Sequence, residues 1–141
     1  MCIRDSARPE LERRAVDISP GSIHFIGFAQ RDELAGYYAL AETFVFPTHS
    51  DPWGLVVNEA MACSLPIICS SAAGCAEDLV THDWNGRLVP AHEVARLASA
   101  MLDLARDEKM RLKMGTRSRQ RIDQYSPQIC ADGLALSLIH I

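Results

Sequence analysis

Short apolar runs of strand length alternate with helical patterns along this chain of 141 residues. A continuous apolar run indicates a parallel strand buried on both faces, and residues 43–46 are expected to form such a central strand. Residues 22–26 alternate instead, and they predict a short strand that ends at Gly27. The full set of predicted strands is 22–26, 43–46, 66–70 and 86–89.

Helical periodicity fills the segments between these runs. Asp32 is expected to cap a helix that reaches Ala41, and Pro127 to restart a weaker helical segment. The predicted apolar face of the helix at 94–105 consists of Val94, Leu97, Ala98, Met101, Leu102 and Ala105. The predicted helices are 7–15, 32–41, 54–63, 76–81, 94–105 and 107–125. This alternation predicts an α/β, Rossmann-like parallel sheet with flanking helices and right-handed crossovers.

The two ends of the chain are related through their codons. Leu136–Ile141 can be encoded by CTG TCT CTT ATA CAC ATC, and the reverse complement of that sequence encodes Met1–Asp5 followed by Ser or Arg. Such an inverted repeat is typical of sequencing adapter. Residues 1–6 and 136–141 are therefore expected to be adapter-derived artefacts, which leaves 7–135 as a natural segment without its own start or stop.

The composition is that of an ordinary globular domain with a sizeable core. Hydrophobic residues make up 48% of the chain and charged residues 23%, and the net charge of −4 argues against nucleic acid as a partner. No apolar run reaches the roughly eighteen residues needed to span a bilayer. Four cysteines outside the ends lack a Cys-x-x-Cys pair, which argues against a zinc site and fits a reducing cytoplasm: Cys63, Cys69, Cys75 and Cys130.

Two carboxylates, Asp51 and Glu59, lie on either side of a predicted loop-to-helix junction. The loop that leaves the carboxyl end of a parallel strand is where ligands bind in open α/β sheets. Asp51 also fits the N-cap of the helix, with Pro52 at the first helical position. Glu59 lies in an otherwise apolar helix, where a carboxylate needs hydrogen-bond donors. Ligand hydroxyls would supply them, and an exposed stripe or a buried ion pair is the alternative.

The start of the same helix predicts an anion site. The backbone N–H groups of Trp53, Gly54, Leu55 and Val56 would lie at the positive end of the helix dipole, which suits a diphosphate. Gly54 would also let a ligand approach the backbone closely. A second loop, which contains Gly74, follows the next strand and enters a helix. The two loops are therefore expected to converge on one crevice.

In order and spacing, these motifs resemble the C-terminal domain of family 4 glycosyltransferases, the group 1 enzymes of the GT-B fold. The resemblance covers about residues 23–105. Where the family has two glutamates separated by seven residues, this chain has Asp51, which is one methylene shorter, and Glu59. Ser64 stands where the family usually has glycine. The remaining motifs are Phe46-Pro47-Thr48, Pro52–Asn58, Ala60–Ala62, Pro66–Ser70, Ala73-Gly74, Asp78–Val80 and Asn85–Val89.

The resemblance implies a truncated C-terminal half of a GT-B enzyme, in which residues 7–135 form a partial nucleotide-sugar-binding domain. It implies that the whole enzyme transfers a sugar from a UDP-, GDP- or ADP-sugar with retention, and without a metal or other cofactor. Asp51 would hold the donor sugar and Glu59 the ribose, so both are expected to be catalytic. The expected substrate-binding residues are Asp51, Trp53, Gly54, Leu55, Val56, Glu59 and Gly74. Gly27 and Phe28 fall where the family binds the base.

The acceptor, a glycan, lipid or small molecule, would bind to an N-terminal domain that lies outside this segment. The isolated segment is therefore expected to be inactive, and the enzyme to work in the cytoplasm, either free or at the inner face of the membrane. Two alternatives remain open. One is a non-catalytic Rossmann-like binding or signalling module, although residues 22–47 lack the acidic cluster of a receiver domain. The other is a different GT-B enzyme, such as a sugar-nucleotide epimerase.

Other polar residues have simpler expected roles. His49 lies two residues before Asp51 and is the histidine expected nearest to the ligand. His24 is expected to be structural, and His82 and His92 to face solvent. The Lys and Arg residues between 106 and 121 are expected to form a solvated helix face.

Overall fold

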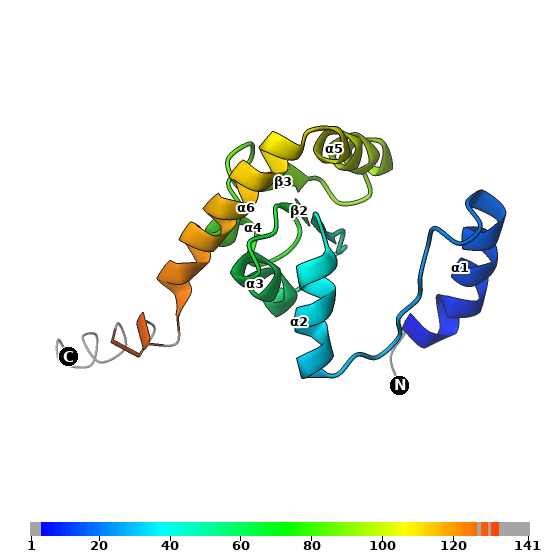
Figure 1. The fold of residues 1–141 in the computed structure, drawn as a ribbon, viewed down its shortest axis with the longest axis horizontal. Helices are drawn as coiled ribbons and strands as arrows, with labels where there is room; N and C mark the ends of the chain where they lie inside the picture. Colours follow the sequence, from blue (N-terminus) through cyan, green and yellow to red (C-terminus); the bar gives the residue numbers. More distant parts are fainter. Residues whose placement is uncertain (1–3, 127, 130, 133–141) are drawn as a thin grey trace. The chain divides into compact units, whose positions relative to one another are not determined.

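The computed structural model describes residues 4–126, 128, 129, 131 and 132, and it divides into two compact units at the boundary between Leu34 and Ala35. This boundary lies within helix α2 (Arg31–Leu40). The first unit contains helix α1 (Arg4–Ile18), a turn at residues 20–22 and an irregular segment that leads to α2 (Figure 1). The helix predicted at 7–15 and the Pro20-Gly21 turn are therefore present.

The strand predicted at residues 22–26 does not form. Ile23 and Ile26 are each about half exposed, at 49% and 52%, and the Phe25 carbonyl accepts a hydrogen bond of 3.0 Å from the Arg8 side chain. A strand is stable only when a neighbouring strand pairs with its backbone. In the described part of the chain, residues 22–26 have no such neighbouring strand, so their alternating pattern alone does not produce a strand.

The second unit is built on a parallel sheet of three strands in the order β1-β2-β3. These are β1 (Phe44–Phe46), β2 (Ile67–Ser70) and β3 (Gly86–Val89), all at predicted positions. One expectation is corrected, because β1 lies at an edge of the described sheet and is only half-buried. The central strand is β2, whose four residues are all buried because it has a neighbour on each side.

The helices of the second unit follow the predicted order. They are the rest of α2, then α3 (Leu55–Ala62), α4 (Ala76–Leu79), α5 (Val94–Arg106) and α6 (Glu108–Ile122), with a final 3₁₀ turn η1 (Asp123–Tyr125). Because α2 begins at Arg31, Asp32 lies inside its first turn and not at its N-cap. The expected restart at Pro127 lies outside the described residues.

The core has two layers because side chains of β2 alternate between the two faces of the sheet. Ile67 and Cys69 pack in a cluster with α3 and α4, which contribute Met61 and Leu79. Ile68 points to the other face and packs in a second cluster with α5 and α6. The sheet is therefore covered on both faces, as expected for parallel strands.

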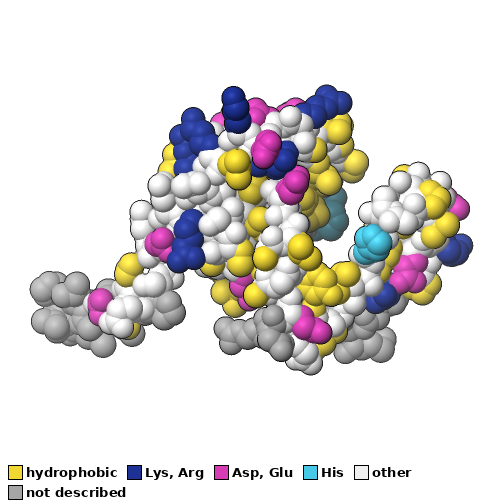
Figure 2. Space-filling model, viewed as in Figure 1, with side chains coloured by type: hydrophobic (Ala, Val, Ile, Leu, Met, Phe, Trp, Pro, Cys, Tyr) yellow, Lys and Arg dark blue, Asp and Glu magenta, His cyan; other side chains and the backbone are white. Residues whose placement is uncertain are grey.

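Helix α5 buries a narrower apolar face than its sequence predicts. Leu97 is half-buried, while Ala100 and Leu104 are buried against the sheet. The other predicted core residues are exposed: Val94, Ala98, Met101, Leu102 and Ala105. Figure 2 shows hydrophobic side chains on the surface of α5. The sheet covers only the stripe at positions i, i+3 and i+7, so periodicity overestimates the buried face.

Figure 2 shows Lys and Arg side chains along α6. Only some of them form the solvated face that the sequence predicts. Lys109 and Lys113 are exposed, as predicted. Three guanidinium groups instead donate to backbone carbonyls of other segments. Arg111 donates to Leu104 O at 2.6 Å and Ala105 O at 2.9 Å, Arg117 to Trp84 O at 3.1 Å, and Arg119 to Ala62 O at 2.8 Å.

Candidate functional site

The loop between β1 and α3 contains the first predicted carboxylate, Asp51. Its Oδ1 accepts a hydrogen bond of 2.9 Å from the backbone N–H of Trp53. Helix α3 begins only at Leu55, and its N-cap is Gly54, with φ of 91° and no side-chain cap. The prediction that Asp51 caps α3 with Pro52 at the first helical position is therefore wrong. Asp51 closes an Asx turn before the helix, and the left-handed Gly54 separates the two.

A second loop, residues 71–75, is joined to this one through the backbone, as the predicted convergence requires. Gly74 N–H donates to Asp51 O at 2.9 Å, and Cys75 N–H donates to Trp53 O at 3.0 Å. A Cβ at residue 74 would lie 2.0 Å from Pro52 O. Only glycine therefore allows the two backbones to approach this closely. The contact that requires Gly74 in this structure is with the neighbouring loop.

The start of α3 is open to solvent. Leu55 and Val56 are 69% and 38% exposed, and no other described residue accepts a hydrogen bond from their backbone N–H groups. Gly54 is buried, and a Cβ there would lie 2.8 Å from the Phe46 ring. The Trp53 indole N–H donates to Asn58 Oδ1 at 3.0 Å. Two free donors therefore lie at the positive end of the helix dipole.

Glu59, the second predicted carboxylate, is exposed on α3 and accepts a hydrogen bond of 3.0 Å from the Tyr38 hydroxyl of α2. Of the interpretations open from the sequence, the exposed position applies, and Tyr38 supplies a hydrogen-bond donor that the sequence did not reveal. Burial, and then the hydrogen bond and charge of Glu59, raises the pKa of Tyr38 to about 12. Asp51 and Glu59 contact different partners, the 71–75 loop and α2.

Two buried thiols belong to this region, those of Cys69 in β2 and of Cys75 at the end of the second loop. The hydrogen bond with Cys75 and burial raise the pKa of the Cys69 thiol, which also donates to Ser70 O at 3.3 Å. Cys63, by contrast, is exposed at the end of α3. Among the described residues, no group of three or more His, Cys, Asp or Glu side chains could hold a metal ion.

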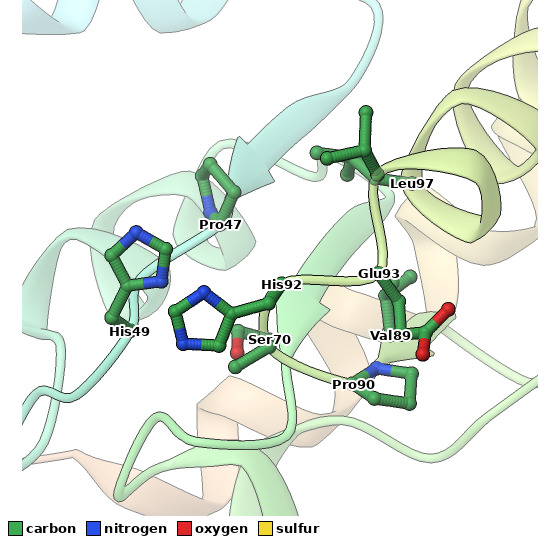
Figure 3. Close-up of a pocket in the computed structure, with 10 residues that line it drawn as sticks. Pro47, His49, Ser70, Val89, Pro90, His92, Glu93 and Leu97 are labelled. Atoms are coloured by element: carbon green, nitrogen blue, oxygen red, sulfur yellow. The ribbon is translucent and has the colours of Figure 1, made fainter.

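A pocket that the sequence did not reveal lies where all three strands end. Pro47 and His49 follow β1, Ser70 ends β2, and Pro90 and His92 follow β3, around a cavity of about 100 Å³ (Figure 3). The imidazole rings of His49 and His92 stack, with centroids 4.2 Å apart and an interplanar angle of 12°. His92 is exposed, as expected, and it also contacts His49, the histidine expected near the ligand. Each lining segment lies at or directly after the end of a parallel strand, and this position in the sequence was the signal that could have predicted the pocket.

These features together define a Rossmann-like α/β domain with its candidate site at the carboxyl edge of a parallel sheet. Residues 10–121 match the family described as glycosyl transferases group 1, and the chain belongs to that family. Its fold is that of the C-terminal domain of GT-B glycosyltransferases. In the described part of the chain, no helix is both long and apolar enough to cross a membrane.

Three similar proteins show how much of a family member the chain represents. It is 33% identical over 102 residues to the D-inositol 3-phosphate glycosyltransferase of Kineococcus radiotolerans. The aligned region covers 67% of this chain and 23% of that protein. The C-terminal domain of a glycosyl transferase group 1 family protein (LpcC) from Francisella tularensis is 28% identical, with a TM-score of 0.78, and covers 87% of this chain and 64% of that chain.

The third is Anabaena Alr3699/HepE in complex with UDP, which is 22% identical, with a TM-score of 0.87 over 100% of this chain and 39% of that chain. At this identity the likeness shows the fold. The chain spans 35%, 23% and 20% of the length of three curated relatives that it matches. The chain therefore spans well under two thirds of the length of each of these relatives.

Proposed function

We propose that this chain is the donor-binding part of a retaining glycosyltransferase, which transfers a sugar from a nucleoside-diphosphate sugar to a glycan, lipid or small-molecule acceptor. The observation that carries this proposal is the open start of α3 beside the Asp51 loop. Two exposed residues with free N–H groups, Leu55 and Val56, lie next to a carboxylate held in a fixed turn. An anion and a hydroxylated sugar are the two parts of a nucleotide-sugar.

The diphosphate would bind at these N–H groups. Negative charge develops on the diphosphate as the bond to the sugar breaks, and fixed backbone donors stabilise that charge without reorganising. The helix dipole of α3 adds to this effect. We propose that the protein needs no metal or other cofactor, because these donors take the role that a cation has in other sites. Anabaena HepE, which shares the fold, was solved in complex with UDP, and this supports a nucleotide-sugar donor.

The two carboxylates would hold the sugar and the ribose. Asp51 uses Oδ1 for the Trp53 N–H, which leaves Oδ2 for a hydroxyl of the donor sugar. Glu59 uses Oε2 for Tyr38, which leaves Oε1 for a ribose hydroxyl. Each acid is thus oriented by one protein donor and keeps one oxygen for the ligand. Gly74 would contribute by holding the second loop against Pro52, so that the crevice keeps its shape.

We propose that the whole enzyme acts in the cytoplasm or at the inner face of the membrane. The acceptor would bind mainly to parts of the enzyme that this chain does not contain, so the isolated chain is expected to bind the donor weakly and to transfer nothing. Measurable sugar transfer by the chain alone would contradict that expectation.

Titration of the ¹⁵N-labelled chain with UDP-, GDP- and ADP-glucose tests donor binding directly. We expect one of the three to shift the amide signals of residues 53–56, and Glu59→Ala to weaken its binding at least about tenfold, equivalent to 1.4 kcal/mol. Asp103→Ala, which removes an exposed acid from α5, is the matched control and should change nothing. The proposal is wrong if none of the three donors shifts these signals, or if the two variants bind alike.

A further inference from the structure

We propose that the pocket between residues 47–49 and 90–94 binds an uncharged carbohydrate ring of the acceptor, and that His49 and His92 select it. This inference rests on the proposed function, because it assigns a substrate class to the same edge of the sheet. The donor domain would then contribute directly to acceptor specificity. None of the proposed donor contacts, Asp51, Leu55, Val56 and Glu59, lines this pocket, so the two sites can be tested separately.

The first argument is position. The pocket lies at the carboxyl ends of β1, β2 and β3, the edge where open parallel sheets bind ligands. His49 lies two residues before Asp51 in the same loop, so a group in the pocket would lie beside the proposed donor sugar. An acceptor must lie next to the donor for transfer to occur.

The second argument is the chemistry of the lining. Pro47, the buried Val89 and the half-buried Leu97 form an apolar wall. Ser70 is the buried polar group, at 4% exposure, and its Oγ accepts from Ala72 N–H at 3.2 Å, so its own O–H remains to donate. A sugar ring has apolar C–H faces and hydroxyls at its rim, and it matches an apolar wall with a few polar groups.

The third argument is the pair of imidazoles. The exposed imidazoles of His49 and His92 both line the pocket, and no hydrogen bond between described residues involves either ring. A neutral imidazole offers one donor and one acceptor, which is what a hydroxyl needs. Figure 3 shows the two rings facing one another beside Pro47 and Ser70. Their flat stack adds a second surface for a ring.

The fourth argument is the backbone at His92. Its φ of 67° is in the left-handed region, which glycine and asparagine adopt more readily. This conformation costs free energy, and such residues cluster at ligand sites. The turn itself needs only a residue that tolerates positive φ. The stacking of the imidazole on His49 places it at the pocket.

Charge distinguishes between neutral and anionic ligands. No Lys or Arg is among the residues that line the pocket, and its one formal charge is the acid Glu93. In Figure 3 the Glu93 carboxylate points away from the two imidazoles. A phosphate or carboxylate in an apolar pocket without a cation would be unfavourable. We therefore infer an uncharged ring.

NMR titration of the chain with methyl β-D-glucopyranoside and methyl α-D-mannopyranoside tests this inference. Glucose 6-phosphate is the anionic comparison, and cyclohexylmethanol is the apolar one. We expect at least one glycoside to shift the ring signals of both His49 and His92 at millimolar concentration. His92→Asn keeps a side chain that tolerates positive φ, and should weaken binding at least fivefold without changing thermal stability. His24→Asn, an exposed histidine outside the pocket, is the matched control.

Several outcomes would overturn the inference. Shifts with glucose 6-phosphate alone would indicate an anion site, and shifts with cyclohexylmethanol alone would indicate an apolar one. Displacement of the glycoside by UDP-glucose but not by UDP would assign the pocket to the donor sugar. Absence of any glycoside shift in a chain that binds a nucleotide-sugar would contradict this inference alone. Glycoside shifts without any nucleotide binding would contradict the proposed function, and with it the acceptor assignment.

Discussion

The hydroxyl of Tyr38 donates a hydrogen bond of 3.0 Å to the carboxylate of Glu59 and so joins α2 to α3. The Tyr38 ring is held in turn by an edge contact with Phe44 of β1, with centroids 5.9 Å apart. The proposed ribose-binding acid is therefore oriented by a side chain that packs against the sheet. Changes at Glu59 should be measurable at Tyr38.

Loss of the Glu59 carboxylate should lower the pKa of Tyr38 from about 12 towards its ordinary value of about 10. Burial, the largest single cause of the shift, remains, so the pKa of Tyr38 should fall only part of the way. Because the folded-state pKa is raised, the stabilising contribution is complete below about pH 10 and is lost as the pH rises towards 12. Absorbance at 295 nm of Glu59→Ala against Asp103→Ala measures this. Identical titrations would show that Glu59 does not act on Tyr38.

Asp51 should have two separable roles. Asp51→Asn keeps an oxygen that accepts from Trp53 N–H, whereas Asp51→Ala removes it. We expect Asp51→Ala to lower the free energy of unfolding by about 1 kcal/mol and Asp51→Asn to lower it by less than half of that. Both should weaken nucleotide-sugar binding alike, because both remove the charge. Urea denaturation and NMR titration on the same samples check the two parts, and equal stability losses would contradict the turn role.

Gly74→Ala should be strongly destabilising, because its Cβ would lie 2.0 Å from Pro52 O and force the two loops apart. We expect a loss of about 2–4 kcal/mol in urea denaturation. The matched control is Gly36→Ala on α2, where a Cβ meets nothing within 4 Å. That change should stabilise the chain by about 0.5–1 kcal/mol, because alanine is the better helix former. Similar effects for the two variants would contradict the close approach.

Arg111 should stabilise the end of α5 through its hydrogen bonds to Leu104 O and Ala105 O. Arg111→Leu is expected to lower the free energy of unfolding by about 1–3 kcal/mol, and Lys113→Leu, an exposed control on the same helix, by less than about 0.5 kcal/mol. The ion pair of Arg111 with the exposed Glu42, at 3.2 Å, should add little. The loss should therefore persist at 1 M salt, and its disappearance would assign the effect to the ion pair.

Local pattern was sufficient for most of the second unit. Continuous apolar runs predicted β1, β2 and β3, and helical periodicity predicted α3 to α6, because strand and helix periods are properties of adjacent residues. The same local pattern failed at residues 22–26, where alternation indicates a strand only if another strand pairs with it.

The sequence by itself determined the order of the elements, the family motifs and the positions of Asp51 and Glu59 around one loop and helix. Only the tertiary structure showed that Tyr38 supplies the hydrogen-bond donor for Glu59, that the Asp51 side chain closes an Asx turn before α3, and that His49 stacks on His92. The physical reason is the same in each case. Periodicity records which face of an element is apolar, whereas burial and hydrogen-bond partners depend on segments that lie far apart in the sequence.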